Sequence, residues 1–284
     1  MIPQPSAGEH MPLPFEVLNP RVRRGPFRAA LFDFDGTLSL IREGWPRVMI
    51  GMMVERLHGL GLAREPAEDL WGLVERFVME LNGHPTVVQM TRFADEVRAR
   101  GGEPDAADVY LADYIDRLMR VVRQRWDVLE RGIARPAAWV VPNAHAVLDA
   151  LQGSGVPLFL ASGTDRDAVL YEGALLDVLT PFGPRVFAPC PADPTFSKGR
   201  VATDLLRDLD LDGDELLGFG DGVVETQEVK RVGGVMIGVA SAEPGESGVH
   251  PGKRERLAAA GADVIVPDYG CQDVLLRWLW GEVE

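Results

Sequence analysis

Hydrophobic positions along this chain follow two different spacings, and the change between them divides the sequence. From residue 40 to about 141, apolar residues recur every three or four positions, with Pro and Gly mainly between the blocks. This amphipathic pattern predicts helices at residues 43–60, 65–81, 86–101 and 105–132. We therefore expect this segment to be entirely helical.

The rest of the chain alternates short apolar runs with helical spacing. The runs predict strands at 157–161, 185–188, 215–219, 234–239 and 263–266, and one that ends near residue 34, and the helical stretches are 143–153, 166–178, 198–209 and 272–281. Such alternation is typical of a parallel sheet covered by helices. We predict an α/β fold, a doubly wound parallel sheet with an inserted helical domain.

These patterns divide the chain into three parts. Residues 1–26 are expected to form an N-terminal arm, because residues 1–20 hold five prolines and little periodicity. Residues 27–40 and 142–284 are expected to form the α/β core, and residues 41–141 the helical insert.

The composition limits the classes of partner that this protein is expected to bind. The 29 basic and 43 acidic residues give a net charge of −14, which argues against a nucleic acid or an anionic membrane as partner. No apolar run reaches the roughly 18–20 residues that span a bilayer, and the first residues lack a signal-peptide pattern. We expect a cytoplasmic protein of undetermined oligomeric state. Cys190 and Cys271 form no CxxC motif, so neither a disulfide framework nor a structural zinc site is predicted.

Two aspartates follow the first apolar run. In an extended strand Asp33 and Asp35 share a face, and a turn at Gly36 leaves both at the carboxyl end, where open α/β sheets place their ligands. Two anions so close repel each other unless a cation or proton lies between them. The pair predicts a metal site, although Asp and Gly are also ordinary residues of solvated turns.

Three later stretches also lie where a strand should end. Ser162, Gly163 and Thr164 follow an apolar run and are suited to hydrogen-bond an oxyanion. Lys198 begins a predicted helix after a Pro-rich loop, although a lone lysine there is often a surface residue.

The third of these stretches is acidic. Asp221 lies in a glycine turn, and Glu225 follows four residues later. Oxygen ligands on such a loop suit a hard cation such as Mg²⁺.

These stretches, in this order, resemble the four motifs of the haloacid dehalogenase superfamily of phosphotransferases. The first motif is Asp33-Phe34-Asp35-Gly36-Thr37, and the others are Ser162, Lys198, and Asp221 with Glu225. Residues 38–161 leave room for a helical insert between the first two motifs, which resembles the superfamily's C1 cap. One departure is Glu225, because many members have a second aspartate there, and its role stays open between the metal and Lys198.

The resemblance implies a role for each residue. Asp33 would be the nucleophile that forms an aspartyl phosphate, and Asp35 the acid and base. Mg²⁺ would be held by Asp33, the Asp35 carbonyl and Asp221, while Lys198 and Ser162 would contact the phosphoryl oxygens. Dehalogenation is not expected, because the dehalogenases lack the second acid of the first motif.

The implied function is Mg²⁺-dependent hydrolysis of a small phosphorylated metabolite. A phosphomutase with the same intermediate and a non-catalytic phosphometabolite-binding module are the alternatives. The only partner expected is a small-molecule phosphate ester. The predicted substrate contacts, apart from the core residues Gly163 and Thr164, are cap residues: Arg42, Trp45, His84 and Gln89.

Overall fold

A central sheet carries the sites predicted above. The computed structural model describes residues 13–82, 85–193, 195–242 and 247–283. Within them a seven-stranded sheet has the order β1-β7-β6-β5-β2-β3-β4, in which β1 runs antiparallel to β7 and all other neighbours are parallel. The strands are β1 (Glu16–Val17), β2 (Ala29–Phe32), β3 (Leu158–Ala161), β4 (Val186–Phe187), β5 (Leu216–Gly220), β6 (Val235–Val239) and β7 (Val264–Val266).

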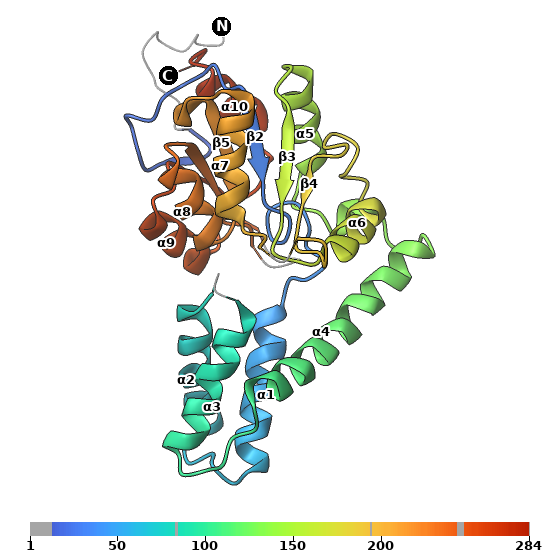
Figure 1. Ribbon diagram of the computed structural model, residues 1–284, viewed down its shortest axis with the longest axis vertical. Coiled ribbons are helices and arrows are strands. Elements are labelled where there is room, and N and C mark those ends of the chain that lie inside the picture. Colours follow the sequence, from blue (N-terminus) through green and yellow to red (C-terminus); the bar gives the residue numbers. More distant parts are fainter. Residues whose placement is uncertain (1–12, 83–84, 194, 243–246, 284) are drawn as a thin grey trace, which may run out of the picture.

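Helices cover both faces of the sheet (Figure 1). They are α5 (Ala144–Gly153), α6 (Arg166–Leu175), α7 (Lys198–Leu209), α8 (Val223–Arg231), α9 (Pro251–Ala260) and α10 (Gln272–Leu279). In β2, Ala30 and Phe32 belong to a buried cluster with α5 and α10, whereas Ala29 and Leu31 belong to a second cluster with α7, α8 and α9. Because both faces are covered, β2 is apolar at every position. The predicted α/β fold is confirmed.

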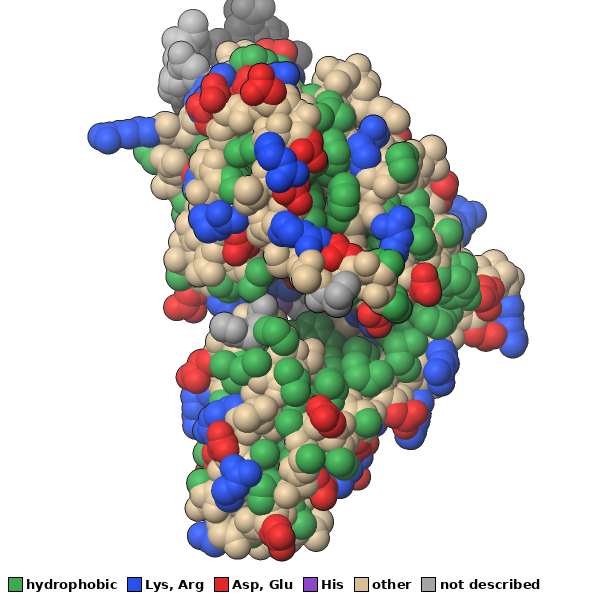
Figure 2. Space-filling view, in the orientation of Figure 1, with side chains coloured by type: hydrophobic (Ala, Val, Ile, Leu, Met, Phe, Trp, Pro, Cys, Tyr) green, Lys and Arg blue, Asp and Glu red, His purple; other side chains and the backbone are tan. Residues whose placement is uncertain are grey.

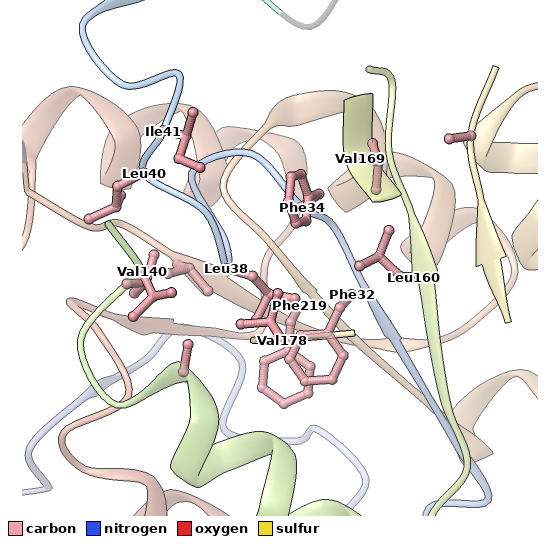
Figure 3. Close-up of a cluster of buried hydrophobic side chains, with 14 of the residues drawn as sticks. Phe32, Phe34, Leu38, Leu40, Ile41, Val140, Leu160, Val169, Val178 and Phe219 are labelled. Carbon is pink, nitrogen blue, oxygen red and sulfur yellow. The ribbon is translucent and has the colours of Figure 1, made fainter. Parts of the chain in front are cut away.

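Aromatic rings fill the first of these clusters. Phe32 stacks on Phe219 with ring centroids 4.3 Å apart, and Phe182 meets Phe32 edge-on at 6.0 Å. Leu38 and Val140, from the stretches that lead into and out of the helical insert, lie in the same cluster (Figure 3). The attachment of the insert is therefore part of the core.

The described part of the helical insert has the four helices that the spacing predicts. They are α1 (Trp45–Gly59), α2 (Ala67–Glu80), α3 (Thr86–Ala99) and α4 (Ala107–Glu130). In Figure 1, α1, α2 and α3 lie below the sheet, and the longer α4 runs from them up to α6. Trp126 of α4 meets Tyr171 of α6 edge-on, with ring centroids 4.8 Å apart. The insert thus contacts the core through α4 as well as through its two connections.

The two connections lie side by side. The N–H of Leu40 donates to the carbonyl of Trp139 at 2.8 Å, and the N–H of Val141 donates to the carbonyl of Leu38 at 3.0 Å. The chain enters and leaves the insert at one place.

Arg125 of α4 braces the first connection. Its Nη1 donates to the carbonyls of Ile41, at 2.5 Å, and Glu43, at 2.8 Å. Its guanidinium also lies over the ring of Trp139, 4.6 Å from the centroid. One side chain of the insert therefore touches both connections.

The structure corrects the expected arm and adds two helices. Glu16 and Val17 pair with β7, so this part of the predicted arm belongs to the sheet, where Phe15 packs on Trp278. The hydrophobic pattern does not predict α8 or α9, because each buries few apolar side chains, among them Val229 and Leu257. In the described residues no helix is long and apolar enough to cross a membrane.

Truncating the central ring tests this packing. Phe32→Ala should lower the free energy of unfolding by about 3–5 kcal/mol, because a fully buried ring is lost and its stacking partner is left against a cavity. Ile133→Ala, at a position that is 71% exposed, should change it by about 0.5 kcal/mol or less. Urea unfolding measures both, and a cost below about 1 kcal/mol for Phe32→Ala would contradict the packing.

Candidate active site

The pairing of β2 with β5 brings Asp33 and Asp221 together. The N–H of Asp33 donates to the carbonyl of Phe219 at 2.9 Å, and Asp221 follows the end of β5 directly. Gly36 turns the chain after β2 with a φ of +74°, and a Cβ there would lie 2.0 Å from Asp221 Oδ2. Only glycine permits both that backbone angle and that approach.

Lys198 bridges two carboxylates. Its Nζ lies 2.6 Å from Asp33 Oδ1 and 3.1 Å from Glu225 Oε2. The lysine begins α7, which is capped by Ser197, while Glu225 lies in the first turn of α8 and accepts the N–H of Gly222 at 2.5 Å. Of the two roles that the sequence left open for Glu225, contact with Lys198 is present in the structure.

Lys253 of α9 makes a second bridge, which the sequence did not predict. Its Nζ lies 3.0 Å from Asp221 Oδ2 and 2.9 Å from Glu43 Oε1, and it donates to Ser241 Oγ at 3.1 Å. Ser241 in turn donates to the carbonyl of Gly36 at 3.1 Å. This buried lysine therefore links the end of β5 to the connection that leads into the helical insert.

Arg42 makes a third bridge. Its Nη2 lies 2.7 Å from Glu172 Oε1, and its Nε lies 3.7 Å from Asp35 Oδ1. Thr164 Oγ1 donates to the other oxygen of Asp35 at 2.7 Å, and Asp35 Oδ1 is buried without a hydrogen-bond partner among the described residues. Glu172 was missed, although helical spacing places it on the same buried face of α6 as Val169.

These contacts leave an excess of negative charge, because each of the three cations contacts two carboxylates. Burial raises the pKa of Asp33 well above its ordinary value, although the charge of Lys198 lowers it. Burial likewise raises the pKa values of Asp35 and Asp221, partly offset by their cationic neighbours. Burial also acts to raise the pKa of Glu225, but Lys198 and hydrogen bonds from backbone N–H groups lower it further, so the net shift is downward. A further cation would stabilise all of the ionised forms.

Three of the carboxylates fit a metal ion. Asp33, Asp221 and Glu225 each offer an oxygen, and these atoms lie within 4.8 Å of one another. Carboxylate oxygens are the ligands of hard cations such as Mg²⁺. The side chain of Asp35 is directed to Thr164 and Arg42. The metal contact expected of its backbone carbonyl is a separate matter and stays a prediction.

A cavity of about 920 Å³ opens over these residues. Figure 2 shows the hollow between the sheet-containing part and the helical insert, with hydrophobic side chains along its lower wall. Most of the charged side chains of the lining come from the core, and the insert contributes the apolar side chains Trp45, Met79, Val87, Leu111 and Ile115. The acidic cluster therefore faces a space large enough for a small metabolite.

The predicted substrate contacts divide into two groups. Arg42, Trp45, Gly163 and Thr164 line this cavity. Ser162 does not, because it is fully buried at the end of β3, where its Oγ accepts the N–H of Thr164 at 3.0 Å. Its predicted contact with a phosphoryl oxygen stays a prediction.

Two cap predictions fall elsewhere. Gln89 is buried inside the insert, where its Nε2 donates to the carbonyl of Val78 at 2.9 Å, and the structure does not bring it to the cavity. The face of α3 that carries Gln89 packs within the insert. His84 lies outside the described residues.

Comparison with known proteins agrees with this architecture. The profile of the haloacid dehalogenase-like hydrolase family matches residues 27–233. The structure of a haloacid dehalogenase-like protein of unknown function from Agrobacterium tumefaciens has a TM-score of 0.60 at 16% identity, covering 89% of this chain and 99% of that one. No curated protein matches the chain.

Two further solved structures are similar. One, a HAD family hydrolase from Deinococcus radiodurans with bound phosphate and sodium, has a TM-score of 0.57 at 16% identity and covers 91% of this chain and 98% of that one. The other, a putative beta-phosphoglucomutase from Thermotoga maritima, has a TM-score of 0.54 at 17% identity and covers 88% and 98%. At these identities the likeness concerns the fold.

Glu172 should make stability depend on pH. Burial raises its pKa to about 7, against 4.5 for an ordinary glutamate, although Arg42 lowers it. The folded protein thus holds this proton more tightly than the unfolded chain. The resulting stabilisation is complete below pH 4.5 and is lost as the pH rises to about 7.

Glu172→Gln removes this titration. Relative to the wild type, its free energy of unfolding should rise by on the order of 3 kcal/mol between about pH 4.5 and 8. Urea unfolding of both proteins at the two pH values, with EDTA present, measures the difference. The same pH dependence in both proteins would show that Glu172 ionises normally.

Proposed function

Because the chain belongs to the haloacid dehalogenase-like hydrolases, we propose that it is a Mg²⁺-dependent phosphomonoester hydrolase that forms an aspartyl phosphate. Its substrate would be a small phosphorylated metabolite held in the cavity between core and insert. Family membership establishes a hydrolase, and the reaction, the metal and the substrate class are our proposal.

The ion pair between Lys198 and Asp33 is the observation that supports this proposal most directly. Asp33 is only 6% exposed, lines the cavity, and has an ammonium group 2.6 Å from one oxygen. Attack of a carboxylate on a phosphate monoester brings two anions together, so it needs positive charge beside both. Lys198 supplies one such charge, and it is held in place by Glu225 at 3.1 Å.

In the first half-reaction an oxygen of Asp33 attacks the phosphorus atom. The new bond joins that oxygen to phosphorus, the bond from phosphorus to the substrate oxygen breaks, and the departing alkoxide takes a proton from the carboxyl group of Asp35. Asp35 is suited to this because Thr164 fixes one of its oxygens and the other, Oδ1, has no hydrogen-bond partner in the described residues.

In the second half-reaction water attacks the same phosphorus atom. Asp35, now ionised, takes a proton from the water, the acyl phosphate bond breaks, and Asp33 is restored as a carboxylate while inorganic phosphate leaves. Arg42 lies 3.7 Å from Asp35 Oδ1, where it stabilises the ionised form between the two steps.

The metal would be held by Asp33, Asp221 and Glu225, together with the carbonyl of Asp35. When bound, Mg²⁺ supplies positive charge that offsets the repulsion between the nucleophile and the phosphate. Glu225 would then contact both the metal and Lys198.

The helical insert would act as the cap. Its apolar side chains form one wall of the cavity, so they exclude water from the reacting groups and contact the part of the substrate beyond the phosphate. Release of inorganic phosphate would distinguish this hydrolase from a phosphomutase, and turnover of an aryl phosphate that stops with EDTA would exclude a non-catalytic binding module.

Substitution of two aspartates should separate the nucleophile from the metal site. Asp33→Asn and Asp221→Asn should each reduce kcat for p-nitrophenyl phosphate by about 10³-fold or more. Excess Mg²⁺ should restore activity only to Asp221→Asn, since that change weakens metal binding without removing the nucleophile. Asp116→Asn, at an exposed position on α4, is the control and should keep full activity. Near-normal turnover by Asp33→Asn would refute the covalent mechanism.

Asp35→Asn should block the second half-reaction but not the first. With acetyl phosphate, whose leaving group needs no proton, the variant should still phosphorylate Asp33 but should not hydrolyse the product, because the attacking water has lost its base. Labelled phosphate should accumulate on Asp33 in a rapidly quenched digest analysed by mass spectrometry. Label on another residue, or unimpaired steady-state hydrolysis, would remove Asp35 from the acid and base role.

A further inference from the structure

Helix α9 presents a row of basic side chains to the cavity. His250, Lys253 and Arg256 all line it, and their spacing of three residues places them on one face of the helix. The sequence pattern did not predict this helix, so none of the three was expected at the site.

Two of these residues have their roles fixed by contacts. Lys253 bridges Asp221 and Glu43. His250 caps α9, since its Nδ1 accepts the N–H of Lys253 at 3.2 Å. In the neutral imidazole the proton then lies on Nε2, so this cavity-lining residue has an N–H donor.

Arg256 differs from the other cations of the cavity. Lys198, Lys253 and Arg42 each bridge two carboxylates, whereas Arg256 has no ion pair or hydrogen bond in the part of the chain that the structure describes. Burial lowers its pKa, with Asp221 and Glu255 acting in the opposite direction. A guanidinium stays charged at any physiological pH, so the cavity holds a partly buried cation that lies near Asp221 and Glu255 but pairs directly with no carboxylate among the described residues.

The sheet order separates this cation from the expected phosphate contacts. β2 lies between β5 and β3, so the loop after β3, with Gly163 and Thr164, is on one side of Asp33. β6, which leads to α9, is on the other side, beyond β5. A ligand whose phosphate lies at Asp33 and that extends towards α9 would therefore reach Arg256 with a different group.

We propose that Arg256, assisted by the Nε2–H of His250, binds a second anionic group of the substrate, a carboxylate or a second phosphate. The planar guanidinium matches either group with two parallel hydrogen bonds. This assignment rests on the proposed function, because it places the first phosphate at Asp33. The substrate class is then a phosphate monoester with a second negative charge.

Binding to the Asp33→Asn protein tests the site without turnover. Calorimetry with Mg²⁺ present compares glycerol 3-phosphate, 3-phosphoglycerate and 1,3-propanediol bisphosphate, which share a three-carbon chain. At least one of the two ligands with a second anionic group should bind about tenfold or more tightly than glycerol 3-phosphate, as expected for one added charge-assisted contact. Which of them gains identifies a carboxylate or a phosphate as the second group.

Two further substitutions in this background locate the contact. Arg256→Gln should abolish the preference, and Arg256→Lys should restore only part of it. Arg254→Gln is the matched control, because it removes a positive charge from the same helix where the side chain pairs with Glu16 outside the cavity. It should keep the full preference, and thermal unfolding checks that each variant is folded.

The outcomes separate this inference from the proposed function. Equal affinity for the three ligands, or no binding of any, or a preference that survives Arg256→Gln, would overturn the second anion site. A preference that depends on Arg256, in a protein whose wild type releases no phosphate from any of the three ligands or from p-nitrophenyl phosphate, would overturn the hydrolase mechanism and leave the site standing.

Discussion

The repulsion among carboxylates at one edge of the sheet is the constraint on which the rest of the site depends. Lys198, Lys253 and Arg42 each lie against two acidic side chains, and each comes from a different element: α7, α9 and the connection to the helical insert. Removing one of these cations would leave two carboxylates close to one another with little water around them. The positions of those three elements are therefore tied to the chemistry, and a bound divalent cation would complete the same balance.

The short-range features of the site could be read from the sequence. Asp33 and Asp221 follow apolar strands directly, and Asp35 lies in the turn after the first of them. A strand followed by a turn is a local signal that does not depend on distant parts of the chain. The same signal placed Thr164 at this edge of the sheet, but its hydrogen bond to Asp35 was not predicted. The parallel sheet and the four helices of the insert were predictable because each has a hydrophobic pattern of its own.

The partners of these residues could not be read in the same way. Lys253 lies in a helix that buries few apolar side chains, and its contact with Glu43 joins segments that are far apart in the chain. Gln89 shows the converse difficulty, since helical spacing predicts α3 but does not say which face meets the cavity and which packs inside the insert. Glu172 had a signal, a charge on the buried face of a predicted helix, and such a residue is best interpreted as one half of an ion pair.

The strand order also has a consequence for the growing chain. β2 is made early, yet Ala30 pairs with Leu158 on one side and Leu217 on the other, so one edge of β2 stays uncovered until β3 has been synthesised and the other until β5 has been synthesised. The helical insert is built from one continuous segment and can fold in the meantime. During that interval the apolar strand Ala29–Phe32 is an open template for aggregation. The charges of Asp33 and Asp35 directly after it act as gatekeepers that discourage pairing with other chains.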